Sequence, residues 1–502
     1  MFRKRLALWL VCALLCTLFA AAPPAFAEDE IPTARGDEEE EPETESCGDY
    51  EYAVLADGSA MIVSYSGDTA ELVIPEELDG IPVSTLGIRA FSWHDEITSI
   101  VFPPSLTTLN DFCFSYCRKL KDVSLPATVL TVNGNPFAAC ESLEHIRLPE
   151  DHPTLEMTDG MLFSREDGRL ICCPQPLAPD NYTVPEGTKI IGRGAFHSCS
   201  RLVSIRLPLS LETIEANAFY LCEGLKRVKI HKGVTRIDEQ AFRSCRSLSA
   251  FEIPDTMTEI SASLFEDCIA LKEITIPDSV QAIGPLAFKN CRSLTEVTVP
   301  PGVTRIEANT FADCKSLTRA SLPDSVTVID SGAFINCFEL SDFTVPPVLT
   351  EIGSEAFYFC EKLTEFPMPD TVTAIGSKAF HSCTGLTELH LPSGFTFLSD
   401  GMFEGCTGLT SFEIPETVTV IGEWVFTGCQ RLQSVTIPEG VTSIGSLAFC
   451  TCTSLASLVI PGSVTEIGEK AFFQSPNLVL TVAPGSFAEE YCETNAVPYV
   501  NP

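Results

Sequence analysis

Phenylalanine recurs every 23 residues along most of this chain, each time after a small or apolar residue. Between these positions, leucine, valine and isoleucine return at fixed offsets. Such a period predicts a solenoid, in which each repeat buries its apolar side chains only by stacking on its neighbours. The register holds for sixteen copies with one interruption: Phe91, Phe114, Phe137, then Phe196, Phe219, Phe242, Phe265, Phe288, Phe311, Phe334, Phe357, Phe380, Phe403, Phe426, Phe449 and Phe472.

The repeat that starts at Phe288 shows how each coil is predicted to fold. Residues 294–299 alternate between apolar and polar side chains, which predicts a short strand. Pro300 ends the strand, and Val303 and Ile306 return the chain along the convex side. Ala-Phe-x-x-Cys then packs a helical turn against the core. A glycine follows the isoleucine in several repeats, and we expect it to permit a tight, left-handed turn: Gly284, Gly353, Gly376, Gly422, Gly445 and Gly468.

The block Ile-Pro-x-Ser-Val-Thr-x-Ile-Gly-x-x-Ala-Phe-x-x-Cys is nearly complete at residues 276–291 and 460–472. It resembles the BspA-like leucine-rich repeats of bacterial surface and secreted proteins, and the resemblance extends over about residues 50–502. The resemblance implies a leucine-rich-repeat solenoid, a right-handed superhelix with a parallel β-sheet on the concave face and short helical turns and loops elsewhere. It also implies an adhesin or interaction scaffold, since some members of this family bind host extracellular-matrix proteins.

The ends of the repeat region resemble the caps of the same family. Residues 50–74 hold Asp57-Gly58 between apolar stretches, which predicts an N-terminal hairpin cap. Ser486 and Glu489 form a capping box that opens a final helix, and Val497-Pro-Tyr-Val closes the C-terminal cap. The expected parts are therefore the N-terminal cap with the first coil at 50–90, the solenoid at 91–485 and the C-terminal cap at 486–502.

The first 27 residues predict a signal peptide. A basic start at residues 3–5 precedes an apolar run at 6–22, and Ala25 and Ala27 fit cleavage by signal peptidase after Ala27. Residues 28–49 are rich in glutamate and poor in apolar side chains, which predicts an acidic disordered linker. Because no later stretch is apolar enough to span a bilayer, we expect a secreted or cell-surface protein without membrane insertion after cleavage.

The interruption between Phe137 and Phe196 is 59 residues long, which is 36 more than one period. Two apolar stretches, 161–164 and 169–172, flank Arg165-Glu-Asp-Gly and predict a β-hairpin insertion at about 150–180 that projects from the solenoid. Such an insertion decorates the binding face in many repeat proteins. The alternative is a packing patch between two half-solenoids, and the sequence does not decide between the two.

Cysteine occupies the third position after the phenylalanine in most repeats. A column with one thiol per coil supplies no tetrahedral metal shell, and its side chains run parallel, so we expect buried, reduced thiols and no metal or other cofactor. Cys172 and Cys173 in the insertion are the best candidates for a reactive or bridging thiol. The expected structural ladder consists of Cys117, Cys140, Cys199, Cys222, Cys245, Cys268, Cys291, Cys314, Cys337, Cys360, Cys383, Cys406, Cys429 and Cys452.

The charge balance excludes some partners. The chain has 32 lysines and arginines against 68 aspartates and glutamates, a formal net charge of −36, which repels nucleic acid and anionic membranes. No catalytic or phosphate-binding motif is present in the sequence. We therefore expect a non-enzymatic, monomeric binding scaffold acting through the concave face. The alternatives are a structural envelope component, or an enzyme with its site at the hairpin insertion.

The strand positions eight and ten residues after each phenylalanine should point outward. They are acidic or small in most of the later coils and basic in the early ones. Our hypothesis is a cationic recess that binds a protein or an anionic glycan. The alternative is that Glu252 and the acidic background neutralise these charges. The candidate ligand-binding residues are Arg147, Arg206, Arg227, Lys229, His145 and His231.

Overall fold

The computed structural model describes residues 43–502 of the chain. The expected signal peptide and residues 28–42 of the expected linker lie outside the described residues. Residues 45–47, also expected in the linker, instead form strand β1 (Glu45–Cys47), which pairs antiparallel with β2 (Tyr50–Val54). The ordered unit, residues 44–502, therefore begins before the boundary that composition indicates.

The N-terminal hairpin cap is present where the sequence predicts it. Strands β2 and β3 (Ala60–Tyr65) are antiparallel, and Gly58 between them has a φ angle of +83°. The cap joins the first coil because β3 pairs in parallel with β6 (Ile81–Leu86). The short strand β5 (Glu77–Leu78) pairs with the other part of β6.

Most coils contribute to a first row of parallel strands, most of which begin eight residues after the phenylalanine, whereas the coils of Phe357 and Phe380 contribute none. Glu296 pairs with Arg319 on the next coil, so residues with the same place in the repeat lie side by side. The first row consists of β4 (Glu71–Val73), β7 (Ser99–Val101), β9 (Asp122–Ser124), β11 (His145–Arg147), β15 (Asn181–Thr183), β17 (Ser204–Arg206), β19 (Arg227–Val228), β21 (Ala250–Glu252), β23 (Glu273–Thr275), β25 (Glu296–Thr298), β27 (Arg319–Ser321), β29 (Asp342–Phe343), β33 (Ser411–Glu413), β35 (Ser434–Thr436), β37 (Ser457–Ile460), β39 (Val479–Val482) and β40 (Tyr499–Val500).

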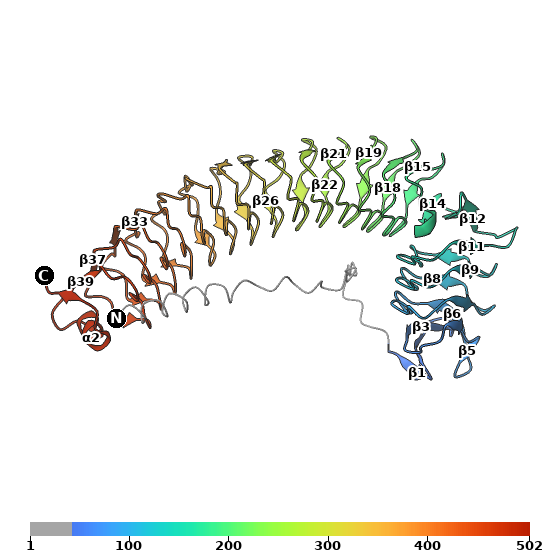
Figure 1. Ribbon diagram of the computed structural model, residues 1–502, viewed down its shortest axis with the longest axis horizontal. Coiled ribbons are helices and arrows are strands. Elements are labelled where there is room, and N and C mark those ends of the chain that lie inside the picture. The colour runs from blue at the N-terminus through green and yellow to red at the C-terminus, as the bar shows by residue number, and fades with distance from the viewer. Residues whose placement is uncertain (1–42) are drawn as a thin grey trace, which may run out of the picture. The chain divides into compact units, whose positions relative to one another are not determined.

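A second row of parallel strands replaces the loop that we expected on the return path. Figure 1 shows β18, β22 and β26 of this second row separated from β15, β19 and β21 of the first row. Each strand is only two residues long, too short to show a period of two in the sequence. The second row consists of β8 (Thr108–Leu109), β10 (Thr131–Val132), β16 (Ile190–Ile191), β18 (Thr213–Ile214), β20 (Arg236–Ile237), β22 (Glu259–Ile260), β24 (Ala282–Ile283), β26 (Arg305–Ile306), β28 (Val328–Ile329), β30 (Glu351–Ile352), β31 (Ala374–Ile375), β32 (Phe397–Leu398), β34 (Val420–Ile421), β36 (Ser443–Ile444) and β38 (Glu466–Ile467).

The segment around each phenylalanine forms tight turns in place of a helical turn. In the coil of Phe288, the N–H groups of Leu286, Phe288 and Asn290 each donate to a carbonyl of the next coil, at 3.1, 2.9 and 2.7 Å. Leu286 and Asn290 have φ angles of +62° and +61°, and the same two positions are left-handed in nearly every coil. Because left-handed residues alternate with ordinary ones, the N–H groups of every second residue point toward the next coil. Backbone hydrogen bonding therefore explains these positive φ angles.

The glycines after the isoleucine were expected to be left-handed, and that prediction is wrong. All six lack a positive φ angle and instead pack against the preceding coil. A Cβ atom on Gly284 would lie 2.7 Å from the backbone nitrogen of Ala262, and one on Gly468 would overlap Ser446. Glycine is therefore needed here for close approach of two backbones.

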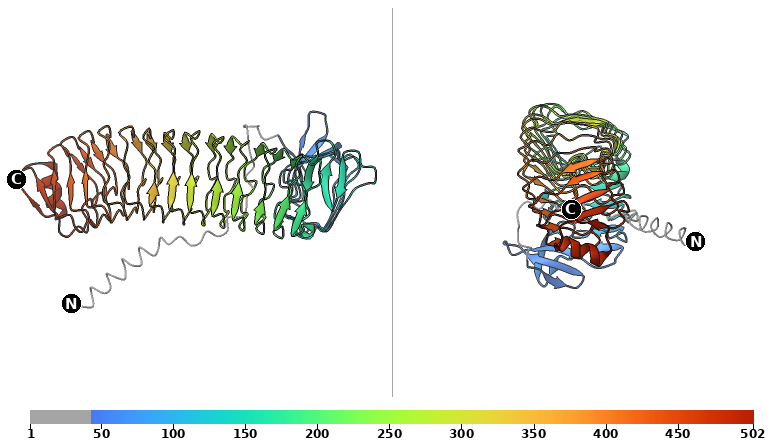
Figure 2. Two further views of the ribbon diagram at one scale, coloured as in Figure 1. Left: turned by 90° about the horizontal axis from the view of Figure 1, so that it is seen from above. Right: turned by 90° about the vertical axis from the view of Figure 1, so that its left-hand side faces the viewer.

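The buried core consists of two apolar clusters, with the phenylalanine rings as its spine. Successive rings stack at centroid distances from 4.9 to 6.1 Å, first from Phe91 to Phe137 and then from Phe196 to Phe472. Figure 2 shows the coils following one another along the unit. Stacked repeats bury one another's apolar faces, as the sequence predicts.

The insertion lies between the two clusters and does not project as a free hairpin. Strands β12 (Leu155–Thr158), β13 (Met161–Ser164) and β14 (Arg169–Cys172) form an antiparallel sheet that continues in parallel to β16. Leu162 and Ile171 belong to the first cluster, which holds the rings from Phe91 to Phe137, whereas Phe163 and Leu170 belong to the second, which holds those from Phe196 to Phe472. Because apolar residues face both ways, the insertion is a packing layer, which decides between the two alternatives left open by the sequence.

The C-terminal cap also follows the sequence prediction. Ser486 caps the N-terminus of helix α2 (Phe487–Asn495), and its side chain accepts a hydrogen bond from the N–H of Glu489. Strand β40 then pairs with β39. Besides α2, the described residues contain one short 3-10 helix, η1 (Gln175–Leu177), and no helix long and apolar enough to cross a membrane.

Candidate interaction surface

Three of the predicted cationic residues lie together on the first row of strands. Strands β15, β17 and β19 are neighbours, with Ser204 paired to Arg227 and Ile205 to Val228. This register places Arg206 beside Lys229 on the outward face. Arg206, Arg227 and Lys229 are all exposed, and none forms an ion pair with another described residue. The neutralisation expected from Glu252 therefore does not take the form of a direct pair.

Arg227 and Lys229 line a hollow of about 510 Å³ that we call the cationic hollow. Its other charged residues are Glu252 and Glu273, from strands β21 and β23. A neighbouring hollow of about 590 Å³ continues over β23 and β25 and shares Glu273 with the first. The surface thus changes from basic to acidic across adjacent coils.

The structure separates Arg147 and His145 from this surface. Both lie on β11, at the end of the sheet β11-β9-β7-β4, and the insertion stands between β11 and β15 in the chain. The Arg147 guanidinium binds the Asp122 carboxylate at 2.7 Å, and His145 pairs with Asp122 in the strand register. The single recess expected from sequence is therefore divided, and its cationic part is limited to the second side of the insertion.

His231 supports the backbone, contrary to its expected place in the recess. Its Nε2 lies 2.8 Å from the carbonyl oxygen of Pro208, and the N–H of Gly233 donates to its Nδ1 at 3.0 Å. Both ring nitrogens are engaged, because the carbonyl accepts from Nε2–H while Nδ1 accepts. His152 is held in the same way, between the Pro126 carbonyl and the N–H of Leu155.

The fourteen ladder cysteines are buried and form a column of hydrogen bonds. Thirteen thiols donate to the carbonyl oxygen of the phenylalanine 26 residues earlier, at 3.0 to 3.3 Å. Cys199 instead lies 3.8 Å from the Cys173 carbonyl. Burial raises the pKa of thirteen of these thiols, to about 12 for Cys406, and at Cys199 a side-chain hydrogen bond with Cys173 and burial raise the pKa, so the ladder stays protonated at neutral pH.

Cys172 and Cys173 are not the accessible thiols that we expected. Both are buried, with at most 2% of their surface exposed, and burial raises the pKa of Cys172 well above its ordinary value. A reactive thiol needs exposure and a lowered pKa. Neither cysteine is exposed, and the pKa of Cys172 is raised. All cysteines in the described part of the chain are free, and no three metal-ligating side chains converge there.

The repeats match a family model described as the BspA type leucine-rich repeat region, in six copies. The matched residues are 68–165, 178–292, 258–383 and 350–479, which together exceed half of the chain. This protein belongs to the BspA-type leucine-rich-repeat family.

The chain is also similar to solved structures of bacterial leucine-rich repeat proteins. A leucine-rich repeat protein from Bacteroides ovatus is 23% identical, with a TM-score of 0.50, over 93% of this chain and 100% of that chain. This likeness confirms the leucine-rich-repeat solenoid fold. A leucine-rich cell surface protein from Faecalibacterium prausnitzii is 25% identical, with a TM-score of 0.38, over 86% of this chain and 95% of that chain. No curated protein matches the chain at a significant level.

In this BspA-type chain a polar network bridges the insertion, and the sequence did not indicate it. Arg193 binds Asp111 at 3.0 Å, and the Asn135 amide donates to the Gly194 carbonyl at 2.8 Å, so residues before and after the insertion are joined directly. Burial raises the pKa of Asp111, although Arg193 opposes the shift. These residues fall at variable positions of the repeat, which leaves them without a periodic signal.

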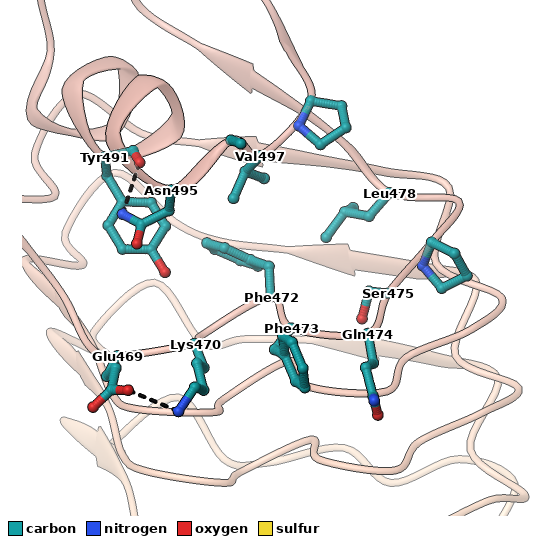
Figure 3. Close-up of a pocket in the computed structure, with 13 residues that line it drawn as sticks. Glu469, Lys470, Phe472, Phe473, Gln474, Ser475, Leu478, Tyr491, Asn495 and Val497 are labelled. Atoms are coloured by element: carbon teal, nitrogen blue, oxygen red, sulfur yellow. Dashed lines mark hydrogen bonds and ion pairs between the residues drawn. The ribbon is translucent and has the colours of Figure 1, made fainter. Parts of the chain in front are cut away.

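A second kind of hollow, of about 400 Å³, lies where the phenylalanine spine ends (Figure 3). Phe472, Leu478 and Val497 line it, with Tyr491 from α2. The Tyr491 hydroxyl donates to the Gly468 carbonyl at 3.3 Å, and Lys470 pairs with Glu469 at 2.8 Å. The helix of the C-terminal cap therefore covers the last ring of the spine incompletely.

Proposed function

We propose that this protein is an exported, non-enzymatic scaffold that binds a protein partner through the first row of strands, at the cationic hollow. Membership of the BspA-type family supports a binding role. The leader pattern of residues 1–27 supports export to the cell surface or beyond. The observation that carries the proposed site is the group of exposed cations, Arg206, Arg227 and Lys229, without ion-pair partners among the described residues of a chain whose net charge is −36.

A protein segment fits this surface better than an anionic glycan. Arg227 and Lys229 attract carboxylates, but Glu252 and Glu273 in the same hollow repel a uniformly anionic chain. Val228 and Phe251, which are buried, also line the hollow. A segment that carries acidic residues over β17 and β19, followed by apolar or basic residues over β21 and β23, would complement all of these groups.

The test is capture of a partner from extracellular-matrix and bacterial-envelope extracts by the exported protein. Arg206→Glu combined with Lys229→Glu should abolish capture, because it reverses two neighbouring cations. The matched control is Lys362→Glu with Arg431→Glu, which changes the net charge equally at exposed cations outside the hollow. A partner that the first variant still captures would have to bind elsewhere. A partner that both variants lose would bind through net charge alone. If heparin prevents capture and the captured material contains no protein, the result would favour an anionic glycan as the partner.

A further inference from the structure

Trp93 and Tyr116 form an aromatic pair on the turn side of the first two coils. Their ring centroids are 3.8 Å apart and the planes differ by 3°, so the rings stack face to face. Both residues stand two positions after a spine phenylalanine, and both have positive φ angles. Most other coils place a non-aromatic residue there, as at Ala139 and Ser198, with Phe359 as an exception, so packing of the turn does not require an aromatic residue.

Tyr116 covers one face of the indole and is itself only 7% exposed, whereas Trp93 is 48% exposed. A planar ring with one covered face and about half of its surface accessible presents the opposite face to solvent. Phe91 is the first phenylalanine of the spine, so no earlier coil supplies a ring at this position.

An ion-paired group of three charges lies beside this ring. The Arg118 guanidinium lies 5.6 Å from the Trp93 centroid and binds Asp95 at 3.2 Å and Glu141 at 3.3 Å. Each carboxylate can accept further hydrogen bonds, and two carboxylates against one guanidinium leave this group net negative.

We propose that this surface, Trp93 with Asp95, Arg118 and Glu141, is a second docking site, and that it takes a basic segment of a protein partner. An arginine or lysine side chain of the partner stacks on the open indole face, which is the aromatic surface that attracts cations most strongly. Asp95 and Glu141 then bind its charged end. Tryptophan, tyrosine and arginine are also the residues that dominate binding energy at protein interfaces.

This site is independent of the cationic hollow and selects the opposite charge. It lies in the first three phenylalanine coils, before the insertion, whereas the hollow lies after it. Its charge agrees with the overall net charge of −36, which steers basic segments toward the molecule.

Fluorescence reports on this surface directly. The chain has three tryptophans, so the full-length Trp9→Phe, Trp424→Phe variant emits from Trp93 alone. Titration with a hexa-arginine peptide at 0.15 M salt should change the Trp93 emission in a saturable way. Trp93→Ala in the wild-type background should weaken peptide binding about fivefold, the effect of one cation–π contact, and Trp93→Phe should restore part of the affinity.

The matched control is Phe473→Ala, which removes an aromatic residue of equal exposure, 48%, from the opposite end of the unit. This variant should bind hexa-arginine as the wild type does. Equal affinity of Trp93→Ala and Phe473→Ala would overturn the proposal, because the peptide would then be held by the general acidic surface. An emission change with neutral oligosaccharides but not with the peptide would also overturn it and would indicate a sugar platform.

Discussion

The thiol of Cys291 donates a hydrogen bond to the carbonyl oxygen of Phe265, one coil earlier, at 3.2 Å. The same contact recurs along the ladder, and where serine replaces cysteine, Ser475 donates to the Phe449 carbonyl at 2.8 Å. At the first position, His94 reaches the carbonyl of Tyr65, at 2.9 Å. Each of these positions therefore holds a side-chain donor that satisfies a backbone carbonyl of the preceding coil or cap.

Removal of this donor should loosen two adjacent coils. Cys291→Ala should cost about 1 to 2 kcal/mol, because it leaves the Phe265 carbonyl without its partner and removes the sulfur from the core. Cys291→Ser should cost less, since it keeps the donor. Hydrogen exchange of peptides from the coils of Phe265 and Phe288 measures both effects. Equal exchange in the two variants would mean that the hydrogen bond contributes nothing.

The ladder should also make the protein sensitive to alkali. The thiols have raised pKa values in the folded state, mainly through burial, as for Cys291 and Cys383. On unfolding they return to an ordinary value near 9, so above pH 9 the unfolded chain releases protons that the folded chain retains. Stability should be full below pH 9 and fall steadily above it. Urea unfolding at pH 7 and pH 10 tests this; the same midpoint at both values would contradict it.

Because adjacent coils approach closely at some glycines and not at others, replacement by alanine should change the stability differently at two of them. Gly376→Ala should destabilise by about 1 to 3 kcal/mol, because the added Cβ would overlap the backbone of Ser354. Gly462→Ala should be nearly neutral, since no atom lies within 4 Å of the added carbon. Thermal unfolding of the two variants distinguishes them, and equal stability would mean that the coils can shift to admit the methyl group.

Adjacent residues of β14 should support different halves of the repeat region. Leu170 packs in the second core cluster and Ile171 in the first. Alanine at either position should cost about 2 to 5 kcal/mol. Leu170→Ala should increase hydrogen exchange in the coils of Phe196 and Phe219, and Ile171→Ala in those of Phe114 and Phe137. Increased exchange on the same side for both variants would contradict the two-sided packing of the insertion.

Features that repeat along the chain could be predicted from the sequence. The spine phenylalanines and the buried ladder follow from residue types that recur at fixed offsets, and both caps follow from local motifs, Asp57-Gly58 and the capping box of Ser486 and Glu489. Features that the backbone decides could not be predicted, as at Leu286 and Asn290, whose positive φ angles serve hydrogen bonds to the next coil. In the insertion, the apolar runs Met-Leu-Phe and Leu-Ile-Cys-Cys already lacked the alternation of a half-exposed hairpin, and this is the signal for two-sided burial.

For the interaction surface, the sequence identified the cations but not their partners. Arg206, Arg227 and Lys229 occupy outward positions that the period predicts, and they lie on neighbouring strands as expected. The pairing of Arg147 with Asp122 and the backbone bonds of His231 depend on contacts between coils that no single repeat encodes. The role of a residue at a given repeat position therefore depends on the residues of the neighbouring coil.

The most direct test of the proposed function is the affinity of a captured protein partner as a function of salt. Binding at the cationic hollow predicts that the wild-type dissociation constant rises steeply with salt between 0.05 and 0.5 M, a range of about 14 to 4 Å in screening length. Arg206→Glu with Lys229→Glu should weaken binding at low salt and flatten this dependence, while Lys362→Glu with Arg431→Glu should leave the steep dependence in place. The same affinity and the same salt slope for the wild type and the Arg206, Lys229 variant would contradict the account.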